Sequence, residues 1–166
     1  MGPPAQPVTH RLKQWLPAIA WAILISWAST DTFSTAHTSV VFLPLLHWLF
    51  PHASAETIER LHFFIRKSAH FTEYFVFSFL LWRSLRGQHR GWQIRWAIAA
   101  LAIAAGYSAL DEFHQSFVPS RTASPWDSLI DTSGAAAAQI LLWCWFWFLA
   151  RSSAVTSEIA NKMAQD

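Results

Sequence analysis

The sequence predicts an all-α integral membrane protein with four transmembrane helices, a short interfacial or re-entrant segment, and an amphipathic lead-in helix before the second span. Hydrophobic residues make up 53% of the 166 residues and charged residues only 13%. The 11 tryptophans and 13 phenylalanines are too many for a water-soluble core of this size, whereas a bilayer with its interfacial aromatic belts accommodates them. The net charge of +2 is too small and dispersed to indicate nucleic-acid binding.

The first predicted span covers about residues 15–28. The proline-rich start of the chain favours a cytoplasmic tail over residues 1–14. Arg11 and Lys13 precede the apolar run as in a signal peptide, but no convincing small-x-small cleavage site follows it. We therefore interpret this run as an uncleaved membrane span.

Two shorter elements separate the first span from the second. Residues 37–50 are apolar but shorter than the ~20 residues that a span needs, and Pro44 interrupts them, so they suit a re-entrant or interfacial segment. Over residues 56–66, apolar side chains fall on one helical face and charged side chains occupy the rest. This pattern predicts an amphipathic helix near the membrane surface.

The second and third spans are expected at about residues 68–82 and 92–110, joined by a tight hairpin. The arginine-rich stretch between them contains Gly87 and Gly91, which mark a turn. The third span is rich in alanine and ends where polar residues resume at Asp111.

The fourth span is expected at about residues 126–150, with a cytoplasmic C-terminal tail at 151–166. Residues 124–127 read Ser-Pro-Trp-Asp, which combines an N-cap serine, a proline at the first helical position and an acid at the third. Residues 134–138 are one glycine and four alanines, and such small residues permit close backbone approach between spans.

The distribution of charge predicts the topology. With four spans, both termini share one side of the membrane with the hairpin between spans two and three. This side carries most of the basic residues, so the positive-inside rule assigns it to the cytoplasm. Most acidic residues gather at the opposite, outward-facing side, which places the polar chemistry there.

Polar and ionisable residues gather at the outward ends of spans two, three and four. Because an ionisable side chain in a bilayer is costly unless it is paired or solvated, each is a candidate functional residue. The candidate catalytic residues are His70, Glu73, Asp111, Glu112, His114, Gln115 and Asp127. The candidate anion-binding residues are Lys67, Arg121 and Tyr74.

Two kinds of chemistry suit such a cluster. A histidine beside a carboxylate titrates near neutrality, which suits general acid–base catalysis on an anion that Lys67 and Arg121 would hold. Imidazole and carboxylate groups at i, i+3 on facing helices are also compatible with a divalent metal ion. The candidate metal ligands are His70, Glu73, Asp111 and His114. No other cofactor is indicated.

Two further interpretations remain open. The spacing of Arg121, Asp127 and Asp131 matches the last motif of lipid phosphate phosphatases, except that Asp127 stands where that family has histidine; an aspartate nucleophile would then be required. Alternatively, the charged cluster only holds the spans together in a non-catalytic binding or structural protein. For Glu112 and Asp131 individually, a solvated position at a helix end is an equally good interpretation.

Three short motifs and two single residues carry a resemblance to a known family. Residues 66–74 read Arg-Lys-Ser-Ala-His-Phe-Thr-Glu-Tyr, residues 111–115 read Asp-Glu-Phe-His-Gln and residues 117–121 read Phe-Val-Pro-Ser-Arg, followed by Asp127 and Gly134. Together they resemble the VanZ-like family of bacterial membrane proteins over about residues 65–138. The sequence departs from that family at Asp131, where asparagine is usual, and at Ser120 and Ala138, where glycine is common.

The resemblance implies a multi-pass protein of the bacterial cytoplasmic (inner) membrane. For the founding members of the family it also implies reduced susceptibility to glycopeptide antibiotics such as teicoplanin, but it does not supply a reaction. We expect an outward-facing site that binds or modifies an anionic envelope component. The expected partner is a membrane lipid, a lipid-linked envelope precursor or the glycopeptide target itself.

Overall fold

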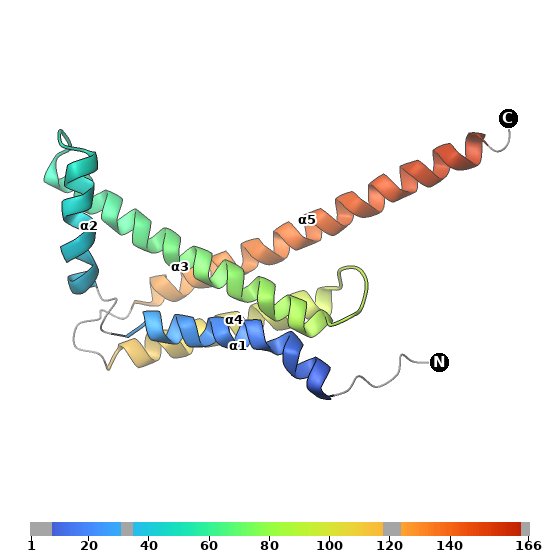
Figure 1. The fold of residues 1–166 in the computed structure, drawn as a ribbon, viewed down its shortest axis with the longest axis horizontal. Coiled ribbons are helices and arrows are strands. Elements are labelled where there is room, and N and C mark those ends of the chain that lie inside the picture. Colours follow the sequence, from blue (N-terminus) through green and yellow to red (C-terminus); the bar gives the residue numbers. More distant parts are fainter. Residues whose placement is uncertain (1–7, 31–34, 118–123, 164–166) are drawn as a thin grey trace.

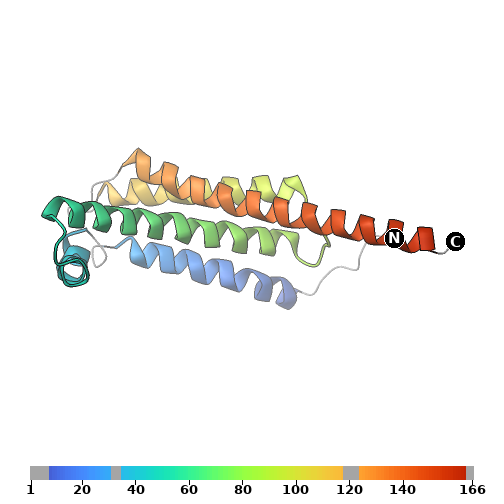
Figure 2. The same ribbon diagram turned by 90° about the horizontal axis from the view of Figure 1, so that it is seen from above.

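The computed structural model describes residues 8–30, 35–117 and 124–163, and all regular secondary structure within them is helical. Four helices run along the length of the molecule (Figures 1 and 2): α1 (Val8–Ala28), α3 (Ala55–Arg86), α4 (Ile94–Gln115) and α5 (Pro125–Met163). The fifth, α2 (Thr35–Leu49), lies across one end of this bundle. The prediction of an all-α chain is confirmed.

Two segments of the described chain are long and apolar enough to cross a membrane. They are α4 and the Pro125–Ala154 part of α5. Large apolar side chains remain exposed on both, including Ile98 and Leu110 on α4 and Trp145 on α5. Such a surface suits a lipid environment, because exposed apolar patches of this extent are rare on water-soluble monomers. Membrane crossing by α1 and α3, and hence the count of four spans, stays a prediction.

Several helices extend beyond the predicted elements. α1 begins at Val8, inside the segment predicted as a tail. The predicted lead-in helix and second span form a single helix, α3, of 32 residues, because neither proline nor glycine interrupts it. α5 continues to Met163, through most of the predicted C-terminal tail, because residues 151–163 contain neither proline nor glycine. α2 is a helix of 15 residues despite Pro44 within it.

The residues predicted to mark a turn and a helix start lie at or beside the ends of helices in the structure. Gly87 ends α3 with a φ of 58°, and Gly91 in the hairpin has a φ of 83°, backbone conformations that glycine adopts readily. α5 begins at Pro125, as the Ser-Pro-Trp-Asp sequence predicts. The hairpin and the helix start are therefore confirmed.

Small residues allow α3 and α5 to cross closely. A Cβ atom added to Gly134 would lie 2.1 Å from the carbonyl oxygen of Phe71, so only glycine fits at this crossing. Ala135 and Ala138 are fully buried beside it. The predicted close backbone approach of residues 134–138 is confirmed, and α3 is the helix that α5 contacts most extensively.

α2 packs against the first half of α3. The ring of Phe42 stacks on the imidazole of His62, with 5.9 Å between the ring centroids. Burial and the nearby charge of Arg66 lower the pKa of His62, so this histidine is neutral at physiological pH and can take part in an apolar contact. The transverse position of α2 suits the interfacial alternative predicted for residues 37–50.

Candidate functional site

The polar cluster lies at the end of the bundle where α1 and α4 end, α5 begins and α2 crosses (Figure 1). On α4 its members are spaced i, i+3, i+4 and i+7, which places them on one face of the helix. They are Ser108, Asp111, Glu112 and Gln115, of which all except Asp111 are buried. α3 contributes Lys67 and His70 from its middle, and α5 contributes polar residues from its first two turns.

An ion pair and a histidine–carboxylate contact link α3 to α5. The ammonium group of Lys67 donates a hydrogen bond to the carboxylate of Asp127, and both side chains remain partly exposed. One turn further into the bundle, Nδ1 of His70 lies 3.4 Å from Oδ1 of Asp131. The first pair is near the surface, whereas Asp131 is only 1% exposed.

Asp131 is held by α4 as well as by α3. The hydroxyl of Ser108 donates a hydrogen bond of 2.8 Å to Oδ2 of Asp131, and its oxygen also lies 3.0 Å from that of Ser128. A serine hydroxyl has one proton, so Ser108 can donate fully to only one of these two acceptors at a time. A carboxylate buried to this degree requires such partners, because desolvation of its charge is otherwise costly.

The sequence-based candidates did not include Asp131, because a solvated position at a helix end was an equally good interpretation. The structure instead places it at the centre of the cluster, where α3, α4 and α5 meet. Two signals were present in the sequence. Asp131 follows Asp127 by one turn on the same face of α5, and Ser108 begins the polar stripe of α4.

Asp111 and Glu112 have separate partners. Oδ2 of Asp111 accepts hydrogen bonds from the hydroxyl of Ser29, the residue after α1, at 2.6 Å, and from the side-chain amide of Gln115, at 2.7 Å. Oε2 of Glu112 accepts the backbone N–H of Ser124 at 2.8 Å, which attaches the residue before α5 to the end of α4. These contacts link the end of α4 to the residue after α1 and to the residue before α5.

Among the described residues, two other predicted site residues do not join this network. His114 is exposed at the end of α4. Tyr74 is fully buried among core side chains, where an external anion has no access. Arg121 lies outside the described residues. Within 8–30, 35–117 and 124–163, no group of three or more His, Cys, Asp or Glu side chains is arranged to hold a metal ion.

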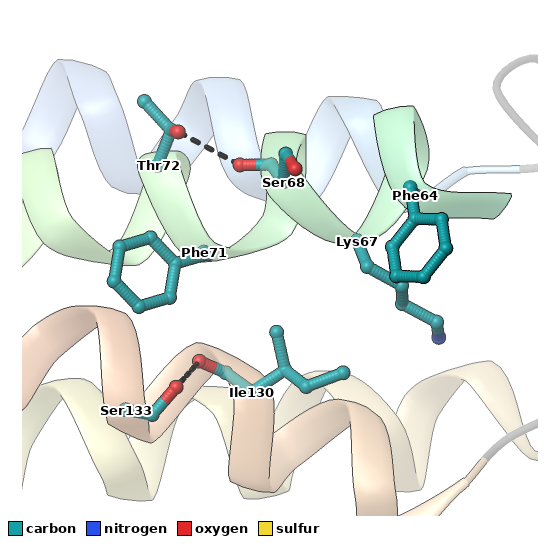
Figure 3. A pocket seen from close by; sticks show the side chains of 7 residues that line it. All are labelled: Phe64, Lys67, Ser68, Phe71, Thr72, Ile130 and Ser133. Atoms are coloured by element: carbon teal, nitrogen blue, oxygen red, sulfur yellow. Dashed lines mark hydrogen bonds between the residues drawn. The ribbon is translucent and has the colours of Figure 1, made fainter. Parts of the chain in front are cut away.

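Two pockets flank the His70–Asp131 pair. One, of about 160 Å³, lies between α1, α2 and α3, and its polar lining includes Ser29, Arg66, His70 and Glu73. The other, of about 330 Å³, is an open groove between α3 and α5 (Figure 3). His70 therefore lies in the wall of the first pocket while its Nδ1 atom faces Asp131.

Comparison with known proteins identifies the family. A family model described as VanZ/LLP1 matches residues 14–149, a range that includes every member of the polar cluster. No curated protein and no solved structure matches the chain. The chain therefore belongs to the VanZ/LLP1 family.

Proposed function

We propose that this VanZ/LLP1 protein is a multi-pass protein of the bacterial inner membrane, and that its pocket between α1, α2 and α3 binds or modifies an anionic envelope component. Its family, its two apolar helices and its exposed apolar surface support the membrane assignment. The basic hairpin between α3 and α4 lies at the opposite end of the bundle from the pocket. By the positive-inside rule the hairpin and both termini face the cytoplasm and the pocket faces outward.

The chemistry of the pocket suits a phosphate or carboxylate group. Arg66 brings a guanidinium group to the lining, and guanidinium binds such anions in a bidentate manner. Glu73 and His70 line the same space and supply groups that can exchange protons. The pocket lies at the end of the bundle that α2 covers, and α2 is the element predicted to lie at the membrane surface. The expected ligand is therefore a membrane lipid or a lipid-linked precursor.

His70 is the residue on which the proposal depends. A carboxylate that faces one ring nitrogen of a histidine fixes its tautomer and orientation, which leaves the other nitrogen available for a ligand. Asp131 is in position to do this because it is buried and faces Nδ1 of His70, and the same histidine lines the pocket. This arrangement allows His70 to exchange a proton with a bound ligand.

The test compares two arginines of α3. The full-length protein in detergent is incubated with a polyprenyl phosphate, and retained ligand is measured by native mass spectrometry. Arg66→Gln should reduce binding by on the order of tenfold, since a charge-assisted hydrogen bond is worth ~1.5–3 kcal/mol. Arg60→Gln is the matched control, because Arg60 is 72% exposed and pairs with Glu56 away from the pocket. Equal binding by both variants would contradict the proposal.

A resistance readout can accompany this measurement. Expression of the wild-type chain in a glycopeptide-susceptible host should reduce teicoplanin susceptibility if the property of the founding members extends to this protein. His70→Ala should remove the effect while the protein remains in the membrane fraction. A phenotype that His70→Ala leaves intact would separate any resistance role from this pocket.

The second candidate is a non-catalytic protein whose charged cluster holds the spans together. It is supported by the intramolecular partners of Lys67, Asp127, Asp111 and Glu112. A double-mutant cycle between His70 and Asp131 separates the candidates, with unfolding free energy and ligand binding as its two readouts. Coupling in stability alone favours the structural role, whereas coupling in ligand binding favours the binding site.

A further inference from the structure

The groove between α3 and α5 is open and mostly apolar. Figure 3 shows Phe71 of α3 and Ile130 of α5 on the two sides of a space of about 330 Å³. The groove extends along α3 from Phe64 and Lys67, near the polar end of the bundle, to Thr72, one to two turns further in. Its volume is at the lower end of the range for small-molecule sites.

Two of the three hydroxyl groups along the groove donate their protons within their own helix. The hydroxyl of Thr72 donates a hydrogen bond of 2.7 Å to the carbonyl oxygen of Ser68, and that of Ser133 donates one of 2.6 Å to the carbonyl oxygen of Ile130. Each proton is thus used within its own helix, as is common for serine and threonine in helices. Apart from the hydroxyl of Ser68, the middle of the groove presents mainly methyl, methylene and aromatic surface, which suits a hydrocarbon chain.

Lys67 lines the outer end of the groove, and its ion-pair partner Asp127 lies beside it. Nζ of Lys67 lies 5.3 Å from the ring centroid of Phe63 and donates to Asp127. The side chains of Lys67 and Asp127 are 20% and 17% exposed, so a ligand can reach both. A purely anionic headgroup would bind Lys67 but meet repulsion from Asp127. A headgroup with a phosphate and a primary ammonium complements both charges, because the ammonium can donate hydrogen bonds to the carboxylate.

We propose that this groove binds a single phospholipid with a primary ammonium headgroup of the phosphoethanolamine type. The phosphate contacts Lys67, the ammonium contacts Asp127, and one acyl chain lies between Phe71 and Ile130. This site is separate from the pocket between α1, α2 and α3, so it neither requires nor excludes the function proposed for that pocket.

The test offers the protein three phospholipids with identical acyl chains. The full chain in detergent is mixed with equal amounts of phosphatidylethanolamine, phosphatidylcholine and phosphatidylglycerol, and retained lipid is identified by native mass spectrometry. We expect phosphatidylethanolamine to be retained about tenfold over either competitor, since phosphatidylcholine has no ammonium N–H and phosphatidylglycerol has no cation. Retention without this preference would overturn the proposal.

Two substitutions separate the headgroup contact from the acyl-chain contact. Asp127→Asn should remove the preference over phosphatidylglycerol, and Ile130→Trp should fill the groove and reduce total retention. Ile140→Trp is the matched control, since Ile140 is an exposed apolar residue of the same helix outside the groove. The thermal midpoint of each variant is recorded in parallel. If Ile130→Trp retains as much lipid as Ile140→Trp, the groove is not the site, whatever Asp127→Asn does.

Discussion

The two halves of α5 differ in what they bury and what they expose. The first half turns small and polar residues inward: Asp131, Gly134, Ala135, Ala138 and Gln139 are all buried. The second half carries exposed aromatic residues, including Trp143, Trp145, Trp147 and Phe148. In water the opposite distribution would be expected. In lipid, apolar side chains gain little by leaving the surface, so close packing and hydrogen bonds decide which face turns inward.

In the buried half of α5, substitution of the charged residue Asp131 should lower the unfolding free energy most. Asp131→Ala removes the acceptor of the Ser108 hydrogen bond and the partner of His70. We expect a loss of about 3 kcal/mol in unfolding free energy, because breaking a buried pair leaves the other group uncompensated. Asp131→Asn keeps an acceptor for Ser108 and should cost less. Unfolding free energies are measured by reversible unfolding in detergent. If both variants lose the same unfolding free energy, the charge of Asp131 and not its acceptor for Ser108 is what stabilises the bundle.

The helix crossing at Gly134 gives the next largest effect. Gly134→Ala places a methyl group against the backbone of Phe71, and the helices must separate, at a cost of about 1–3 kcal/mol. Gly106→Ala is the control, since a Cβ at Gly106 meets nothing within 4 Å. That change should be neutral or stabilise α4 by up to about 1 kcal/mol. Thermal midpoints that shift in the same direction for both variants would disprove the close-packing explanation.

A smaller effect on the unfolding free energy is expected at Gln139, deeper in the interface between α3 and α5. The side-chain amide of Gln139 donates to the hydroxyl oxygen of Ser78 at 2.8 Å and to the backbone oxygen of the same residue at 3.1 Å. Gln139→Leu should cost about 1 kcal/mol, the usual value of an interhelical hydrogen bond in membranes. A double-mutant cycle with Ser78→Ala isolates the side-chain contact. Zero coupling energy would mean that the backbone contact alone matters.

The exposed half should tolerate substitution. Trp145, which is 60% exposed, contributes surface toward lipid rather than toward the bundle. Trp145→Leu should change the unfolding free energy by less than about 0.5 kcal/mol. A loss above about 1 kcal/mol, or one that depends on protein concentration, would instead reveal a protein partner for this face.

The candidate site could be predicted only in part. Lys67, His70, Asp111 and Asp127 are conspicuous because charged residues are rare in apolar helices. Which of them pair could not be deduced, since helical periodicity defines a face but not the neighbouring helix it meets. In the structure His70 faces Asp131, whereas Asp111 accepts a hydrogen bond from Ser29, the residue that follows α1.

The sequence by itself determined the local features of the fold. Composition determined the apolar exterior, glycine and proline placed the hairpin and the start of α5, and the small residues from Gly134 onward predicted a close crossing. Only the tertiary structure decided that Asp131 is the buried centre and that two pockets flank it. Burial of a charge depends on where three helices meet, and this depends on packing between residues far apart in the chain.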